Sequence, residues 1–188
     1  MSKMAILLFS ITLLLGGCAQ PLVQPQNMEE PRVGTQPDTA KMSLVVTSPA
    51  FLHQGVIPVD YTCDGEDINP PLEISGVPRE AKSLVLIVDD PDAPAGDWVH
   101  WLVWNIPAQT TLIEEDSVPD GVQGTTDFNR ALWGGPCPPK GVHRYFFKLY
   151  ALDSLLDLTS EERKVELEEA MEGHILDEAI LIGKYARG

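Results

Sequence analysis

Two short segments of the sequence carry the side chains whose chemistry could form a site. The first reads DDPDAPAGDWVHWLVWNIP and places Asp90 and Asp92 in a proline-containing turn, with His100 in the apolar run that follows. The second reads GGPCPPKGVHRYFFKLYAL and places His143 and Tyr145 after a loop rich in glycine and proline. Imidazole and phenol groups donate or accept hydrogen bonds, and carboxylates accept them. Together these residue types predict one small pocket for an anion.

The loop before His143 adds backbone donors to this set. Gly135 and Pro136 lie among glycines, where backbone N–H groups can approach an anion with no Cβ in the way. We therefore predict that Gly135 offers its amide to the anion and that Asp90 orients a histidine or takes a proton. The alternative is that both histidines are core residues, hydrogen-bonded to Asp90 or to a backbone carbonyl.

Two other kinds of chemistry fit these residues less well. Two histidines and two aspartates could bind zinc or iron, but the histidines lie on different predicted strands and no HExxH spacing occurs. A nucleophilic triad lacks the GxSxG turn, although Cys137 near His143 leaves a Cys–His pair open. We predict no catalytic residue, no metal and no cofactor, with a metal-assisted hydrolase as the weaker alternative.

The elements that position these residues are predicted to be mainly strands. Apolar or alternating runs predict strands at residues 43–47, 56–61, 72–74, 83–88, 98–106 and 143–150. The fourth run is apolar throughout, which is typical of a central strand covered on both faces, and it leads directly to Asp90. In the fifth run, strict alternation would place His100 on one face with Leu102 and Trp104.

The C-terminal part is predicted to be helical. Thr159 and Glu162 have the spacing of a capping box, and apolar residues follow at roughly helical intervals. Gly173 interrupts this helix, and residues 175–186 are predicted to form a second one. The fold class is therefore mainly β, an antiparallel sheet protein with C-terminal α-helices.

Length and charge limit the function further. A chain of 188 residues is long enough for one domain with a substantial core. Its formal net charge of −15 argues against a nucleic-acid partner, because phosphate backbones are bound by basic surfaces.

The N-terminus predicts export. Residues 5–15 form an apolar run that is too short to span a membrane but is typical of a signal peptide. The run ends in LGGC at residues 15–18, which resembles a bacterial lipobox, so we predict a signal peptide at residues 1–17 and lipidation of Cys18. Residues 18–41, rich in proline, glutamine and acids, are predicted to be a disordered tether to a domain at 42–188. The expected location is the cell envelope, with the domain anchored to a membrane by lipid; an ordinary secretory signal is the alternative.

Lipidation of Cys18 would leave two cysteines. Cys63 and Cys137 form an even pair in an oxidising compartment, where disulfides persist. The sequence leaves a disulfide and two free buried thiols equally open.

Several motifs together resemble the phosphatidylethanolamine-binding protein family, in its bacterial branch labelled Raf-kinase-inhibitor-like. They are DPDAP at residues 90–94, WVHW at 98–101, GPCPPKGVHRY at 135–145, YTCDGEDINPP at 61–71 and EGHIL at 172–176. The resemblance spans about residues 42–187, nearly the whole predicted domain.

This resemblance implies a β-sandwich with a small pocket at one edge for phosphate-like or carboxylate groups, commonly shaped by a cis-proline. By motif, the pocket residues would be Asp90, Asp92, His100, Gly135, Pro136, His143 and Tyr145. The function predicted is a non-enzymatic binding protein for a phosphate-bearing ligand or phospholipid head group. The alternative is a protein-interaction module that inhibits an envelope protease or another hydrolase.

Overall fold

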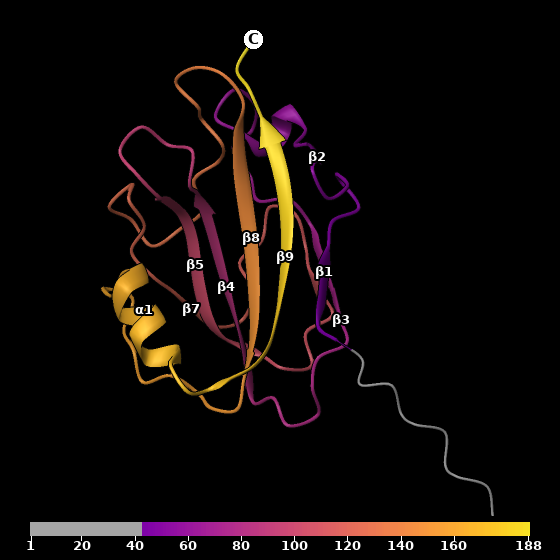
Figure 1. The fold of residues 1–188 in the computed structure, drawn as a ribbon, viewed down its shortest axis with the longest axis vertical. Helices are drawn as coiled ribbons and strands as arrows, with labels where there is room; N and C mark the ends of the chain where they lie inside the picture. Colours follow the sequence, from indigo (N-terminus) through magenta and orange to yellow (C-terminus); the bar gives the residue numbers. More distant parts are fainter. Residues whose placement is uncertain (1–42) are drawn as a thin grey trace, which may run out of the picture. The chain divides into compact units, whose positions relative to one another are not determined.

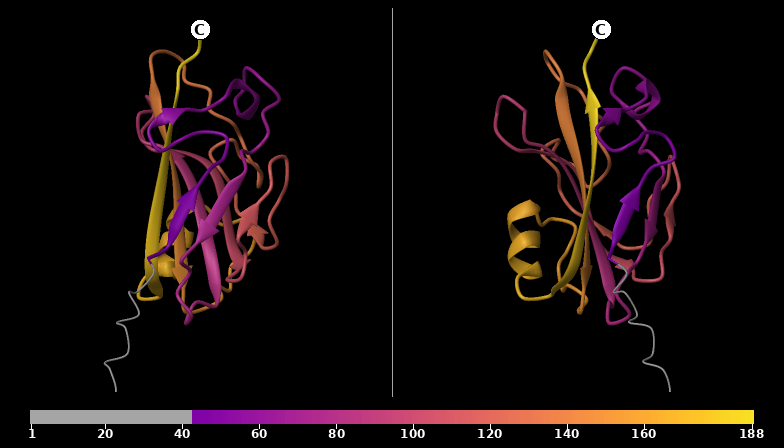
Figure 2. Two further views of the ribbon diagram at one scale, coloured as in Figure 1. Left: turned by 90° about the vertical axis from the view of Figure 1, so that its right-hand side faces the viewer. Right: turned by 45° about the vertical axis from the view of Figure 1, so that its right-hand side comes forward.

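Two β-sheets packed face to face make up the folded unit (Figures 1 and 2). The structure is a computed structural model and describes residues 43–188; the predicted signal peptide, Cys18 and the tether lie outside the described residues. The smaller sheet has the strand order β1-β3-β6, and the larger has the order β2-β9-β8-β4-β5-β7. The predicted β-sandwich is confirmed.

The elements follow the predicted strands closely in the middle of the chain. In order they are β1 (Val45–Thr47), β2 (Gly55–Val56), the 3-10 turn η1 (Val59–Tyr61), β3 (Leu72–Ser75), β4 (Ser83–Asp90), β5 (Trp98–Pro107), β6 (Leu112–Ile113), β7 (Val122–Gln123), β8 (His143–Leu152), α1 (Lys164–Met171) and β9 (Ile175–Tyr185). The strand predicted at 56–61 is wrong over its second half, where residues 59–61 form the 3-10 turn η1. Val56, the first residue of that run, lies in β2, which pairs with β9 in parallel, so the larger sheet is mixed.

The strand β4 is the centre of the larger sheet and is buried along its whole length. Its alternate side chains enter two cores. Leu86 packs between the two sheets with Phe147, whereas Ile87 packs with Leu102 on the opposite face. The helix α1 covers that second core with Leu167 and Met171. Both faces of β4 are therefore covered, as its apolar run predicts.

The prediction of a second C-terminal helix at residues 175–186 is wrong. This segment is the strand β9, which pairs antiparallel with β8 from Leu152↔Ile175 to His143↔Tyr185. Its buried residues alternate toward the C-terminal end, where Leu181, Gly183 and Tyr185 are the buried positions. The apolar residues of the segment fit a helical period nearly as well as a strand period, so the pattern alone did not separate them. The open edge of β8 supplies the hydrogen bonds that make it a strand.

The predicted capping box is also displaced from the helix. The backbone amide of Thr159 donates to Glu162 Oε2 at 3.0 Å, but these residues form a turn before the helix. The helix α1 begins at Lys164, with Arg163 as its N-cap, and is the one α-helix among residues 43–188.

A buried carboxylate attaches α1 to the end of β4. Asp89 is fully buried, and its Oδ2 accepts hydrogen bonds at 2.6 Å from both Lys148 of β8 and Lys164 of α1. Lys164 also pairs with Asp97, in the loop before β5. These contacts hold the last residues of β4 from one face of the sheet and leave Asp90 to face the other.

No helix in the described part of the chain is long and apolar enough to cross a membrane.

Candidate ligand-binding site

A cavity of about 380 Å³ lies where β4 ends and β5 and β8 begin. Four of the predicted site residues line it: Asp90, His100, His143 and Tyr145. The remaining lining residues are Ala93, Pro94, Ala95, Trp98, Phe128, Cys137, Pro138 and Pro139. Because β4 lies between β5 and β8, it brings Asp90 between the two strands that carry the histidines. The predicted convergence of the two segments is thus present.

A β-bulge turns His100 into the cavity. Val88 pairs with Trp101 but Asp89 pairs with Val99, so His100 is the extra residue of β5. A bulge re-aims side chains and breaks the alternation of faces. The His100 ring contacts Tyr145 with centroids 5.2 Å apart, on the side of the core between the sheets. The prediction that His100 shares a face with Leu102 and Trp104 is wrong, because those two residues pack in the other core.

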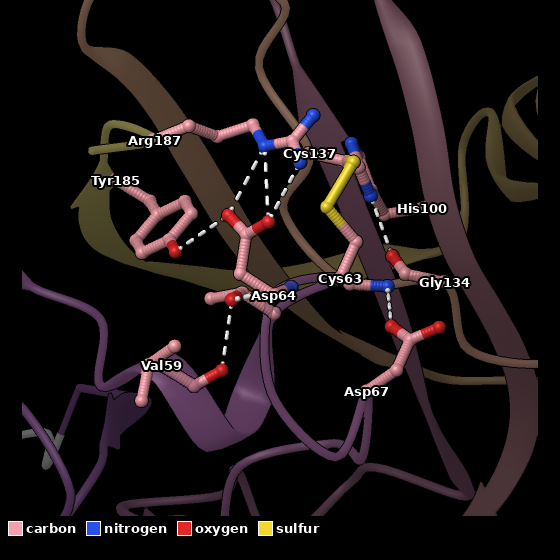
Figure 3. The surroundings of a disulfide bond; sticks show 11 residues. Val59, Cys63, Asp64, Asp67, His100, Gly134, Cys137, Tyr185 and Arg187 are labelled. Carbon is pink, nitrogen blue, oxygen red and sulfur yellow. Dashed lines mark hydrogen bonds and ion pairs between the residues drawn. A yellow bond between two sulfur atoms is a disulfide. The ribbon is translucent and has the colours of Figure 1, made fainter.

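His100 is held as a neutral ring with its proton on Nδ1. The Nδ1 atom lies 2.5 Å from the carbonyl oxygen of Gly134, which can only accept, so Nδ1 donates (Figure 3). The ring is 3% exposed, and burial lowers the pKa of His100. Nearby carboxylates, Asp90 first among them, favour the charged form but do not outweigh burial. The remaining nitrogen, Nε2, therefore carries a lone pair.

His143 is paired with a carboxylate instead. Its Nδ1 lies 2.7 Å from Asp90 Oδ2, and both side chains are buried. The other oxygen of Asp90 accepts the backbone amide of Asp92 at 2.9 Å. Asp90 thus fixes the orientation of His143, and an imidazolium at this position would present Nε2–H to the cavity as a charged donor. The two histidines have the hydrogen bonds expected of core residues, yet both also line the cavity.

The Tyr145 hydroxyl is a buried group without a hydrogen-bond partner among the described residues. Burial, followed by the charge of Asp90, raises the pKa of Tyr145 well above its ordinary value, so the hydroxyl keeps its proton. The Cys137 backbone amide lies close enough to oppose this rise slightly, but it does not complete a hydrogen bond of standard geometry. An unpaired buried hydroxyl costs about 1–3 kcal/mol, which a ligand oxygen would offset.

The other three predicted residues lie around the cavity rather than in its lining. Asp92 binds Arg144 through two side-chain hydrogen bonds of 2.7 and 2.8 Å, and these, with the Arg144 amide and charge, lower the pKa of Asp92 to about 2. Gly135 donates its amide to Asp67 Oδ1 at 2.7 Å, so this amide does not face the cavity as predicted. The carbonyl oxygen of Pro136 accepts from the amide of Cys63 at 3.2 Å.

Asp67 is the reason that the Gly135 amide does not face the cavity as predicted. It comes from a distant loop, and a Cβ on Gly135 would lie 2.4 Å from its Oδ1. Glycine at 135 therefore permits a contact within the protein. Composition indicated that a close approach occurs at this loop but not which group approaches.

A disulfide joins the loop to the neighbouring part of the chain (Figure 3). Cys63 and Cys137 are 74 residues apart, and their Cα atoms lie 5.4 Å from each other. Of the two alternatives left open by the sequence, the disulfide is present and the free thiols are not. Because Cys137 is bridged, it does not form a Cys–His pair with His143. Among the turn and loop backbone–backbone hydrogen bonds of residues 43–188, none involves residues 137–142. The disulfide therefore ties this wall of the cavity covalently to the loop that contains Cys63.

The apolar wall is the part that the sequence analysis missed. Trp98 belongs to the WVHW motif but was not among the predicted pocket residues, and Phe128 lies in a long polar stretch and gives no local signal. The ring of Phe128 contacts both Trp98 and His100, at centroid distances of 5.5 and 5.4 Å.

Two further expectations concern metals and cis-proline. No group of three potential ligand residues that could hold a metal ion occurs among residues 43–188, and none of their peptide bonds is cis, so the implied cis-proline is not found.

The fold and the site place the protein in a known class. A model of the phosphatidylethanolamine-binding protein family matches residues 47–186. The chain belongs to this family, as the sequence motifs indicate. A UPF0098 protein of Methanothermobacter thermautotrophicus is 57% identical over 145 residues, which cover 74% of this chain and 96% of the relative. A UPF0098 protein of Pyrococcus horikoshii is 49% identical over 156 residues, which cover 78% of each chain.

Two solved structures have the same fold. A putative phosphatidylethanolamine-binding protein homologue from Chlamydia trachomatis is 43% identical, with a TM-score of 0.76, and the match covers 78% of this chain and 99% of that one. YbcL of E. coli, described as a new member of the mammalian family, is 32% identical, with a TM-score of 0.73 and the same coverage of the two chains.

Proposed function

We propose that the cavity binds the phosphate group of a small ligand or of a lipid head group and catalyses no reaction on it. The observation that carries the proposal is the buried His143–Asp90 pair, 2.7 Å apart, in the lining of a cavity of about 380 Å³. A carboxylate-supported imidazolium is a strong hydrogen-bond donor to an anion in a desolvated site.

The rest of the lining supports this proposal. The unpartnered Tyr145 hydroxyl offers a second polar contact. Trp98, Phe128 and the prolines 138 and 139 form an apolar wall for whatever is attached to the phosphate. The cavity volume is in the ordinary range of small-ligand sites, roughly 300–1,000 Å³. With a net charge of −15, affinity must come from these short contacts, because the field of the whole protein repels anions.

Calorimetric titration with phosphoethanolamine tests the proposal. We expect binding to the wild-type protein and a loss of roughly 10- to 150-fold in affinity for His143→Ala, because a hydrogen bond to a charged group contributes about 1.5–3 kcal/mol. The matched control is His174→Ala. His174 also pairs with an aspartate through Nδ1, at 2.8 Å from Asp153, but it is exposed and lies just before β9.

The control variant should bind as the wild type does. Absence of any heat at millimolar phosphoethanolamine, or equal affinities of the His143→Ala and His174→Ala variants, would contradict the proposal.

A further inference from the structure

His100 offers the cavity a hydrogen-bond acceptor, whereas an anion-binding histidine is expected to offer a donor. Its Nδ1–H is used by the carbonyl oxygen of Gly134 at 2.5 Å. A second proton on Nε2 would place a positive charge on a ring that is nine-tenths buried or more. The Nε2 atom therefore presents its lone pair to the cavity that the ring lines.

The charged and titratable groups around His100 leave this state unchanged. Three carboxylates act on the ring, namely Asp90 and Asp89 of β4 and Asp67 of the neighbouring loop. His143 and Tyr145 of β8 line the cavity together with His100. The other neighbours of the ring, Phe128 and Gly134, are uncharged. Each carboxylate is already engaged. Asp90 binds His143 and the Asp92 amide, Asp67 binds the Gly135 amide, and Asp89 binds two lysines on the other side of the sheet.

An oxygen placed against this lone pair must carry its own hydrogen. The oxygens of a fully ionised phosphate only accept, so they would repel Nε2 of His100. A phosphomonoester loses its last proton with a pKa of about 6, and its monoanion keeps one P–OH group. A phosphodiester has no P–OH group at any pH at which it is ionised.

We propose that the cavity takes a phosphomonoester as its monoanion, with the P–OH group donating to Nε2 of His100 and the ionised oxygens facing His143 and Tyr145. This inference rests on the proposed function and narrows it: the ligand is a monoester, not the diester of an intact phosphatidylethanolamine. His100 is then the residue that determines specificity. The acidity of the whole molecule acts in the same direction, because a net charge of −15 repels a dianion more than a monoanion.

Two matched probes test the inference, ethyl phosphate as the monoester and dimethyl phosphate as the diester. We expect the ³¹P resonance of bound ethyl phosphate to keep the chemical shift of the monoanion at pH 7.5, where the free ligand is mainly the dianion. Its affinity should fall about tenfold per pH unit above about 6, because the bound form takes a proton from solvent. Dimethyl phosphate should bind at least tenfold more weakly than ethyl phosphate at pH 5.5.

The variant His100→Gln checks the role of the residue. Its side-chain amide can turn an NH₂ group toward the ligand, so the preference for ethyl phosphate over dimethyl phosphate should disappear. Binding of ethyl phosphate as the dianion, or equal binding of both probes by the wild-type protein, overturns this inference and leaves the proposed function intact. Failure of both probes to bind at millimolar concentration overturns the proposed function itself. If the variant does not fold, the ³¹P measurement on the wild-type protein still decides.

Discussion

At the scale of single residues, two histidines in one cavity differ because each has a different partner. The Gly134 carbonyl accepts a hydrogen bond from Nδ1–H of His100 and carries no formal charge. The Asp90 carboxylate accepts a hydrogen bond from Nδ1–H of His143 and is an anionic group. The cavity therefore combines an acceptor and a potential charged donor, both from imidazoles. Neither role can be assigned from the residue type, because a neutral imidazole has one nitrogen of each kind.

The neutral state of His100 has a consequence for stability. Its pKa in the folded state lies below the unfolded value of about 6.5, so below that pH the unfolded chain binds more protons. The contribution of His100 to the free energy of unfolding is complete above about pH 6.5 and is lost as the pH falls toward the folded pKa. The slope from this one group is at most about 1.4 kcal/mol per pH unit.

Urea unfolding of the wild-type protein and of His100→Gln at pH 5, 6 and 7 measures this contribution. The wild-type stability should fall more steeply between pH 6.5 and 5 than that of the variant. Carboxylates with lowered pKa values, such as Asp92, contribute at lower pH and equally in both proteins. Parallel pH dependences would show that His100 does not remain neutral in the folded state.

At the scale of elements, the loop between β7 and β8 decides the shape of the cavity. The Gly134 amide donates to the His100 carbonyl at 3.1 Å, and β8 begins at His143. Between these points the chain is attached to the 61–71 loop by the disulfide, by the Cys63 amide that donates to the Pro136 carbonyl, and by the Gly135 amide that donates to Asp67. The wall formed by Pro138 and Pro139 thus depends on a covalent bond to a loop of another part of the chain.

Removal of this bond should affect both stability and binding. In the chain-entropy model, closing a loop of 74 residues contributes about 4 kcal/mol, so we expect the double variant Cys63→Ser, Cys137→Ser to lose roughly that amount. Its affinity for phosphoethanolamine should also fall, because the wall from 137 to 142 loses its covalent attachment. Urea unfolding and calorimetry measure the two effects.

Dithiothreitol provides the control for this experiment. It should lower the stability of the wild-type protein to that of the double variant and should leave the double variant unchanged. A wild-type unfolding midpoint equal to that of the double variant under oxidising conditions would show that the disulfide does not contribute.

At the scale of the whole molecule, the described chain starts at the end of the sheet opposite the cavity. The amide of Leu44 donates to Asp177 at the beginning of β9, whereas Tyr185 at its end pairs with His143. At about 3.3 Å per strand residue, these ends are separated by roughly 26 Å. Any attachment through the N-terminal segment therefore joins the folded unit far from the cavity, and we expect it to leave ligand binding unaffected.

We propose that this attachment is a lipid on Cys18, following a signal peptide, and that the domain lies in the cell envelope. The supporting observation is the lipobox-like LGGC sequence at the end of an apolar run. The variant Cys18→Ser should move the protein from the membrane fraction to the soluble fraction, with phosphoethanolamine affinity unchanged. Cell fractionation and the mass of the N-terminal peptide measure this. An unmodified Cys18 peptide, or the same fractionation for both proteins, would contradict the lipid anchor.

The sequence by itself determined the features that depend on local pattern. The apolar run 83–88 indicated a buried central strand. The motifs along the whole sequence, and their order, indicated the family. The motifs also selected Asp90, His100, His143 and Tyr145, which do meet at one cavity. The spacing of apolar residues along a short segment indicates whether that segment is a buried strand, so these features can be predicted without coordinates.

Only the tertiary structure decided which partner each group has. It made residues 175–185 a strand, because β8 offered an open edge, and it placed His100 in a bulge that strict alternation excludes. It gave the Gly135 amide to Asp67 and joined Cys63 to Cys137. These outcomes depend on groups that are distant in the chain and near in space. The physical reason is that these hydrogen bonds and the disulfide form between groups that only folding brings together. A local sequence pattern does not identify such partners.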